Sequence, residues 1–376
     1  MRAAFRDPDR RSLLLAAALG LFSLGAVQAA YGPAFPWLLE RHGVGLDRVG
    51  DVVVVHFAGA LSATFASAWL LVRFGYPPIL RTAAAVATTG VVTAALAPSW
   101  PLLLLGAALA GTGFGLMNTS FNVLVARVFT PNAAPQLNLL SATFGLGAVA
   151  GPLVVAWLGG SLRGPLLLLA ATTAVTGLAV LRVAAPEPAS PAGPGRPPWL
   201  AAVGFALLYA LYVGLESGVA SWETVHLEPH LGAARAALFT SAFWATLTIG
   251  RLVAIPFSSL LRPRDLVLGA STASLALLAT AHVQGFAPWA YVLAGLAFSP
   301  IFPTTLAWIE RVFPRRSERI VPLALGVAGF GPMASTALIG ALAARSGPPV
   351  IPTVLSGLAA LLLVVVAALW RGTRRA

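Results

Sequence analysis

The sequence contains no cysteine, and only 10% of its 376 residues are charged. The absence of cysteine excludes disulfide bonds, thiol catalysis and thiolate metal ligands. The shortage of charge excludes a water-facing surface, because a soluble protein carries about 25% charged residues. The five histidines are scattered, without paired spacing on one helix face, so no metal site is expected. No phosphate loop of the G-x-x-x-x-G-K type occurs, so an intrinsic ATPase is not expected. No bound cofactor is expected either.

Apolar residues make up 58% of the chain and occur in long runs. A helix that crosses a bilayer needs roughly 20 such residues, and twelve runs with short connections use nearly the whole chain. The pattern therefore predicts an all-α integral membrane protein with twelve transmembrane helices. The predicted helices cover residues 12–37, 49–73, 78–97, 100–129, 135–159, 163–184, 199–223, 235–261, 264–282, 287–313, 319–344 and 348–370.

A segment rich in proline, glycine and alanine, residues 185–198, separates the first six predicted helices from the last six. Proline and glycine do not sustain a helix over such a stretch, so the segment is predicted to be a cytoplasmic linker. We therefore expect an N-terminal six-helix bundle at residues 1–184 and a C-terminal six-helix bundle at residues 199–376.

Proline within the predicted helices marks places where they bend. Proline lacks the backbone donor that a continuous helix uses, and its ring clashes with the preceding turn. We expect kinks, of the kind that gating helices need, at residues 32–33, 151–152, 298–303 and 331–332.

The two predicted halves share a short motif. ARVFTP at 126–131 matches ERVFP at 310–314, and Arg127 and Arg311 hold the same place in it. We expect these two arginines to have structural or gating roles. A duplicated six-helix half predicts a solute site near the midplane, where the halves meet.

Glycines repeat at the same spacing as this motif. Gly111 pairs with Gly295, and Gly147 pairs with Gly331. Small residues let helix backbones approach closely in a membrane, whatever the function of the protein. We therefore interpret these glycines as packing positions.

All 24 basic residues are arginine, and they are unevenly distributed. With a cytoplasmic N-terminus, 18 of them fall on the cytoplasmic side, 5 on the other side, and Arg251 inside a helix. Basic residues favour the cytoplasmic side, so we expect both termini there. The high content of alanine, glycine, proline and arginine is typical of a GC-rich bacterial genome, so the expected location is the inner membrane of a bacterium. The net charge of +12 is thereby explained by topology, and nucleic acid is not expected as a partner.

Ionisable side chains within membrane spans are costly, so each is a functional candidate. Glu216 either binds solute hydroxyls, exchanges a proton, or pairs with a polar group on a neighbouring helix. Arg251 either pins its helix to an acid or to carbonyls, or recognises an anionic solute. His56 is a second proton-coupling candidate, although a lone histidine is more often a hydrogen-bonded core residue. Glu223 is expected at or beyond the outer surface.

Asn118 and Asn122 stand four residues apart in a predicted helix and therefore share a face. Amides donate and accept hydrogen bonds, which suits a polyhydroxyl solute; hydrogen bonding between helices is the alternative. Asn138 begins the next predicted helix, where we expect a capping or gating role.

Further candidates come from the first helix and from aromatic residues in the second half. Aromatic faces stack on the C–H faces of sugars, although tryptophan near an interface is commonly an anchor. The candidate solute-binding residues are Gln28, Tyr31, Asn118, Asn122, Glu216, Trp222, Trp244 and Phe302.

Four stretches carry a family resemblance: GAVQAAYGPAFP (25–36), LMNTSFNVLV (116–125), LNLLSATFGLGA (137–148) and IFPTTL (301–306). They resemble helices 1, 4, 5 and 10 of the major facilitator superfamily, and within it the fucose-permease-like sugar transporters. The resemblance covers most of the chain. It implies a fold of two pseudo-symmetric six-helix halves and transport by rocker-switch alternating access.

The chain departs from this family pattern at two acids. Gly32 stands where the pattern has an acid in helix 1, and Asn118 stands where it has a Glu in helix 4, while Asn122 matches the Asn of the pattern. The resemblance therefore does not carry proton coupling over to this chain. Glu216 becomes the leading replacement for the missing acids.

These observations predict a secondary active or facilitative transporter of a small polar solute, a sugar or polyol. A proton coupled through Glu216 is the expected co-substrate, and the protein is expected to act as a monomer. No catalytic constellation occurs, so an enzyme is not expected. One alternative is a multidrug or hydrophobic-compound exporter of the same superfamily, and another is a membrane sensor or lipid-handling protein.

Overall fold

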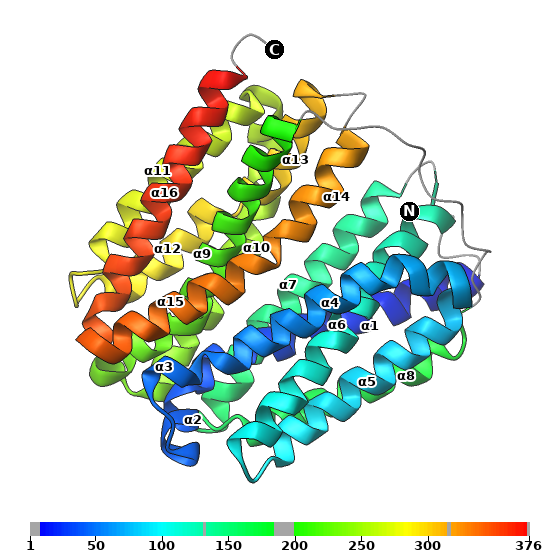
Figure 1. Cartoon of the computed structure of the whole chain (residues 1–376), viewed down its shortest axis with the longest axis horizontal. Helices are drawn as coiled ribbons and strands as arrows, with labels where there is room; N and C mark the ends of the chain where they lie inside the picture. Colours follow the sequence, from blue (N-terminus) through cyan, green and yellow to red (C-terminus); the bar gives the residue numbers. More distant parts are fainter. Residues whose placement is uncertain (1–7, 131–132, 184–198, 314–316, 374–376) are drawn as a thin grey trace. The chain divides into compact units, whose positions relative to one another are not determined.

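The computed structural model describes residues 8–130, 133–183, 199–313 and 317–373 (Figure 1). Within these ranges the regular elements are all helical. The first half contains α1 (Pro8–Ala30), η1 (Gly32–Ala34), α2 (Phe35–His42), α3 (Leu46–Val49), α4 (Asp51–Phe74), α5 (Tyr76–Leu96), α6 (Trp100–Val128), α7 (Ala134–Trp157) and α8 (Arg163–Val180). The second half contains α9 (Trp199–Leu231), α10 (Ala233–Leu260), α11 (Pro263–Thr280), α12 (Ala287–Phe298), α13 (Ile301–Val312), α14 (Ser317–Ala328), α15 (Phe330–Ser346), η2 (Pro348–Val350) and α16 (Ile351–Gly372).

The predicted membrane spans all correspond to helices. Among the described residues, ten helical stretches are long and apolar enough to cross a membrane. The two other predicted spans coincide with α10 and α11, which are 28 and 18 residues long. The prediction of an all-helical membrane fold is therefore confirmed.

The largest difference in helix length concerns α9, which runs to Leu231 instead of ending at the predicted residue 223. No glycine follows in the sequence before Gly232, and the helix continues through Pro229. Gly232 adopts a φ of 74°, a left-handed conformation that glycine accepts and that commonly ends a helix. The extension places Glu223 well inside α9.

Three of the four predicted kinks interrupt their helices. Residues 32–34 form the 3₁₀ turn η1, α12 gives way to α13 at residues 299–300, and α14 gives way to α15 at Gly329. Pro152 instead lies inside the continuous helix α7. Neighbouring helices in a membrane bundle can compensate the backbone group that a proline frees, so a proline does not always break its helix.

The chain forms two compact units that differ from the predicted bundles in one segment. The first unit contains Met1–Tyr31 and Val55–Gly193, and the second contains Gly32–Val54 and Pro194–Ala376. The predicted boundary at 1–184 assigned residues 32–54 to the first bundle. These residues pack instead on helices of the second half, since η1 contacts α9 and α10, and α3 contacts α15. The predicted linker, 185–198, lies outside the described residues.

Close helix packing in the first unit depends on glycine. A Cβ atom at Gly147 of α7 would overlap the carbonyl oxygen of Phe22 on α1. A Cβ atom at Gly111 of α6 would likewise overlap the carbonyl oxygen of His56 on α4. Glycine is needed at both positions because the two backbones are in direct contact.

The second unit repeats this packing at the equivalent positions. A Cβ atom at Gly331 of α15 would overlap the carbonyl oxygen of Ala210 on α9. A Cβ atom at Gly295 of α12 would overlap the carbonyl oxygen of Phe243 on α10. The glycines that the sequence pairs across the two halves therefore make the same kind of contact in each unit.

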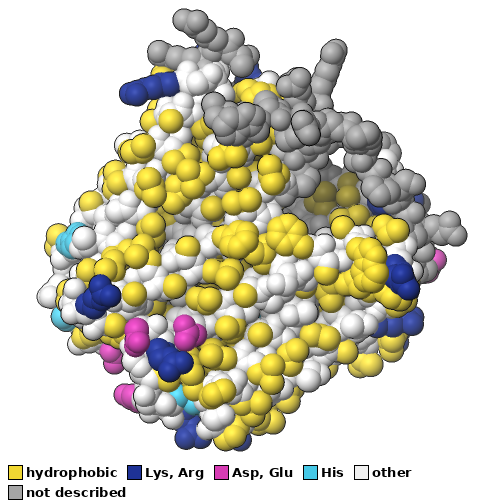
Figure 2. Space-filling model, in the orientation of Figure 1, with side chains coloured by type: hydrophobic (Ala, Val, Ile, Leu, Met, Phe, Trp, Pro, Cys, Tyr) yellow, Lys and Arg dark blue, Asp and Glu magenta, His cyan; other side chains and the backbone are white. Residues whose placement is uncertain are grey.

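The exposed faces of α14, α15 and α16 are largely apolar (Figure 2). Their large exposed side chains include Leu325, Phe330, Leu338, Leu361 and Val364. Charged side chains gather instead near α2 and α3 (Figure 2), close to the ion pair between Arg48 and Asp51, whose Nε and Oδ2 atoms are 3.9 Å apart. Lipid-facing helices with charge at their ends agree with the membrane prediction.

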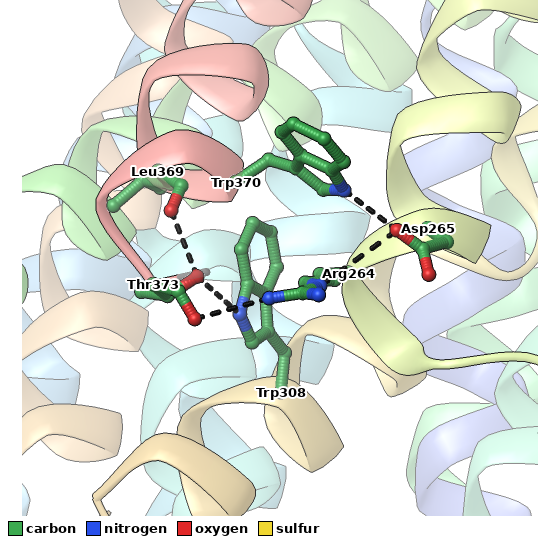
Figure 3. A network of polar contacts seen from close by, with 6 residues as sticks. All are labelled: Arg264, Asp265, Trp308, Leu369, Trp370 and Thr373. Atoms are coloured by element: carbon green, nitrogen blue, oxygen red, sulfur yellow. Dashed lines mark hydrogen bonds and ion pairs between the residues drawn. The ribbon is translucent and has the colours of Figure 1, made fainter. Parts of the chain in front are cut away.

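A polar network ties the end of α16 to α11 and α13 (Figure 3). Trp370 Nε1 donates to Asp265 Oδ1 at 2.6 Å, and Arg264 Nη1 donates to the carbonyl oxygen of Thr373 at 3.1 Å. Trp308 Nε1 donates to Thr373 Oγ1 at 3.2 Å. The Arg264 guanidinium also lies 5.7 Å from the centre of the Trp370 ring. The last turn of α16 is thus anchored from two neighbouring helices.

Asp265→Ala is expected to lower the free energy of unfolding by about 1 kcal/mol, because it removes the Trp370 hydrogen bond and the partner of Arg264. Thermal unfolding of the detergent-solubilised protein, followed by tryptophan fluorescence, measures the change. Glu40→Ala on the exposed face of α2 serves as the control and should leave the midpoint unchanged. Equal midpoints for both variants would mean that the network contributes nothing to stability.

Candidate functional site

Glu216 is held by two partners inside the second unit. Arg251 Nη2 lies 3.9 Å from Glu216 Oε2, and the Tyr212 hydroxyl donates a hydrogen bond to the same oxygen. Tyr212 and Glu216 are four residues apart on α9 and share a face, while α10 supplies Arg251. The side chains of Arg251 and Glu216 are 27% and 12% exposed. Both charges therefore have a partner, as charges within a membrane span require.

One face of α10 carries three polar groups that lack a hydrogen-bond partner within the described part of the chain. They are Trp244 Nε1, Thr248 Oγ1 and Arg251 Nε, and all three atoms are shielded from solvent. Residues spaced by four and three positions lie on one stripe of a helix. Buried polar groups are normally paired, and leaving them unpaired is costly. This donor stripe (Trp244, Thr248 and Arg251) is therefore suited to a bound molecule that carries acceptor oxygens.

Aromatic rings border the Glu216 cluster at the break between α12 and α13. The Tyr212 ring lies 6.2 Å from Phe298 and 6.3 Å from Phe302, measured between centroids. The Tyr209 hydroxyl donates to the Phe302 carbonyl oxygen at 2.9 Å, which fixes the start of α13 against α9. The cluster thus combines a charged pair with flat apolar faces.

In the first unit, Asn122 is bonded to Asn118 along α6. Asn122 Nδ2 donates to both the backbone oxygen and Oδ1 of Asn118, at 2.8 Å and 3.0 Å. The Asn118 amide nitrogen and the Asn122 amide oxygen make no further hydrogen bond among the described residues. The pair therefore presents one donor and one acceptor side by side, both half-buried.

His56 and Tyr31 lie together in the first unit, where they pack edge to face with centroids 5.4 Å apart. Phe57 and Phe114 also contact the His56 ring, at 5.8 Å and 5.7 Å. Neither His56 ring nitrogen, nor the Tyr31 hydroxyl, has a hydrogen-bond partner within the described residues. Gln28 lies three residues before Tyr31 and is half-buried.

Trp222 is enclosed by its own unit. Its ring lies 5.2 Å from Phe35, and a Cβ atom at Gly50 or at Gly340 would touch the indole. The side chain is fully buried. In this conformation Trp222 holds the segment 32–54 against α9 and α15 and offers no open face to a solute.

The residues predicted to gate or to stabilise lie in different settings. Asn138 is exposed and falls in the second turn of α7, whose N-cap is Ala133. Asn138 is therefore not the residue that caps α7, because it lies one turn beyond the N-cap. Its gating role stays a prediction. The Arg127 guanidinium lies 5.6 Å from the centre of the Tyr76 ring, and Arg311 is exposed.

Glu223 was predicted at or beyond the outer surface, but it is fully buried. The extension of α9 to Leu231 explains the difference. Sequence reasoning also missed Tyr212 and Thr248. The spacing of Tyr212 and Glu216 by four residues is a signal that could have identified the first, whereas Thr248 becomes significant only through its missing partner.

No group of three or more metal-ligating side chains occurs among the described residues. The chemistry at hand in the second unit is therefore that of hydrogen bonding, charge pairing and aromatic contact. These groups can hold a polar molecule without transforming it.

Comparisons with known proteins give a consistent result. The model of the Major Facilitator Superfamily matches residues 17–291. Sodium-dependent glucose transporter 1A of Mus musculus is 25% identical, over 91% of each chain. Glucose/mannose transporter GlcP of Bacillus subtilis (strain 168) is also 25% identical, but the match spans 36% of this chain and only 33% of that protein. The crystal structure of D-xylose-proton symporter has a TM-score of 0.75 at 13% identity and covers 95% of this chain and 97% of that one.

Proposed function

Because the chain belongs to the Major Facilitator Superfamily, we propose that it transports a sugar or polyol across the membrane by alternating access. The observation that carries the proposal is the donor stripe on α10, which lies next to the Glu216 carboxylate and lacks partners within the described residues. Two relatives named as glucose transporters support the same solute class.

The site residues suit a polyhydroxyl solute. A hydroxyl group both donates and accepts, so it can donate to Glu216 while accepting from Thr248 or Arg251. The rings of Phe302 and Tyr212 can cover the C–H face of a sugar. Within the first unit, Gln28, Tyr31, Asn118 and Asn122 remain the solute-binding candidates that follow from the sequence.

An exporter of hydrophobic compounds is not favoured. Such a compound would enter the site without acceptors and would leave the donor stripe unpaired, which costs free energy for each buried group. A solute with several oxygens relieves this cost. Any solute that binds the donor stripe must therefore carry acceptor groups, whatever its detailed structure.

The proposal extends to a proton as co-substrate and to the cellular setting. Glu216 and His56 are the candidates for proton exchange that follow from the sequence, and Glu216→Gln tests the first by abolishing pH-driven accumulation while sparing exchange. The arginine distribution supports a cytoplasmic position for both termini, and we propose that the membrane is the inner membrane of a bacterium. We propose that the protein acts as a monomer.

Proteoliposomes test the solute class directly. We expect saturable exchange of at least one labelled compound from a panel of D-glucose, D-mannose, D-xylose, L-fucose and sorbitol. A protein that neither exchanges nor binds any member of the panel would overturn the sugar assignment.

Thr248→Val is expected to weaken the affinity for the exchanged sugar about fivefold, because it removes one hydrogen bond worth about 1 kcal/mol. The affinity is taken from the concentration dependence of exchange. Thr272→Val, on the exposed face of α11, is the matched control and should bind as the wild type does. Unchanged affinity in Thr248→Val would remove this residue from the site.

A further inference from the structure

Glu223 is a buried carboxyl group that the proposed solute site does not use. It has an exposed fraction of 0%, and neither carboxyl oxygen has a hydrogen-bond partner among the described residues. It follows Glu216 by seven residues on α9, so the two acids lie two turns apart on the same face of the helix.

The groups that face Glu223 are uncharged hydroxyls. Thr240 of α10 and Tyr291 of α12 lie next to its carboxyl group. Both hydroxyls are already engaged, since Thr240 Oγ1 is 3.0 Å from Thr224 Oγ1 and the Tyr291 oxygen is 2.9 Å from His226 Nδ1. Each hydroxyl thus has one partner besides Glu223, and neither carries a charge that could compensate an ionised carboxylate.

No described cation compensates Glu223. Several helices pack against α9, among them α2, α10, α13, α15 and α16. Of the described arginines on these helices, Arg251 is the partner of Glu216. The others are exposed: Arg41, Arg235, Arg311, Arg345 and Arg371. His226 reaches Tyr291 from α9 itself. The two acids thus differ in one respect that matters: Glu216 has an arginine beside it and Glu223 has none.

An ionised carboxylate without a partner is strongly disfavoured in a protein interior, so Glu223 must hold a cation in this conformation. A metal ion would draw on several ligands, but no group of three or more metal-ligating side chains occurs among the described residues. A proton needs only the carboxyl oxygen itself. The surroundings of Glu223 therefore suit a proton better than a metal ion.

We propose that Glu223 is a proton-binding site that couples proton movement to solute transport, an assignment that rests on the proposed transport function. The proton bonds to one carboxyl oxygen while the side chain is enclosed. It leaves to water when α9 moves and the carboxylate becomes solvated. Because Glu216 lies on the same face of α9, one movement of this helix changes the surroundings of both acids. Glu223 thus adds a second proton-exchanging acid to the candidate Glu216 on the same helix.

Glu223→Gln tests the proposal, because glutamine keeps the shape of the protonated acid and cannot release a proton. Proteoliposomes with an alkaline interior and D-glucose as the probe should accumulate it with the wild-type protein. The accumulation ratio of D-glucose should be at least tenfold lower with the variant than with the wild type. The variant should still exchange D-glucose when the pH is equal on both sides, and the rate of this exchange should no longer vary between about pH 5.5 and 8.5. Glu228→Gln, five residues on along the same helix, is the matched control and should accumulate D-glucose normally.

Other outcomes separate the possible failures. Normal pH-driven accumulation in Glu223→Gln overturns the assignment, and so does wild-type accumulation that follows a sodium gradient at constant pH. If the wild type exchanges neither D-glucose nor any of the remaining sugars, the transport proposal itself has failed, and not the assignment of Glu223. D-glucose binding in detergent, followed by tryptophan fluorescence, checks that the variant is folded: retained binding with lost accumulation supports the proposal.

Discussion

Substituting Arg251 by glutamine is expected to abolish solute exchange and to lower the free energy of unfolding by about 3 kcal/mol. The substitution leaves the Glu216 carboxylate buried with only the Tyr212 hydroxyl as a partner, and removing one member of a buried ion pair strands the other charge. It also removes the Nε donor at the end of the donor stripe. Exchange in proteoliposomes and thermal unfolding in detergent measure the two effects.

Two further variants separate stability from binding. In Glu216→Gln with Arg251→Gln, no charge is stranded, so the unfolding midpoint should recover while exchange stays absent. Arg235→Gln lies on the same helix but at an exposed position, and it should resemble the wild type in both measurements. If the double variant exchanges sugar normally, the charged pair has no part in solute binding.

Gly111→Ala is expected to lower the free energy of unfolding by about 2–3 kcal/mol, which lowers the unfolding midpoint by roughly 3–4 °C for a chain of this length. The added methyl group would overlap the His56 carbonyl oxygen, and backbone atoms cannot turn aside as a flexible side chain can. Helices α4 and α6 would therefore have to separate along their contact. Thermal unfolding in detergent gives the midpoint directly.

Gly269→Ala provides the opposite result in the same measurement. Nothing lies within 4 Å of a Cβ atom at Gly269, and alanine favours a helix over glycine by about 1 kcal/mol. This variant should therefore be slightly more stable than the wild type. Destabilisation of both variants to the same extent would show that the close contact at Gly111 is not the cause.

Most of the fold could be predicted from the sequence because a membrane allows few solutions. Apolar runs of bilayer length have to be helices, and the proline positions marked where α12 and α14 end. The placement of residues 32–54 could not be predicted in this way. It depends on the fit of Phe35 and Gly50 around Trp222, and no periodic pattern encodes such a contact.

The candidate site could be predicted only where charge made it conspicuous. Glu216 and Arg251 stood out because ionisable groups are rare in membrane spans, but the sequence does not state that they meet. Thr248 resembles many other threonines until its missing partner is seen. Glu223 was misplaced because the end of α9 was set too early, and an error in a helix end changes a surface residue into a buried one.

The glycine contacts shared by the two units have a consequence for mutational tolerance. In a saturation mutagenesis experiment, positions that tolerate no substitution should recur about half the chain length apart. Gly111 and Gly147 should be intolerant in the first half, and Gly295 and Gly331 should be equally intolerant in the second. The solute-facing positions should break this periodicity, since Asn118 has the aromatic Phe302 as its counterpart at the same interval. An ancestral duplication would then have kept its packing positions in both copies, while its binding positions diverged.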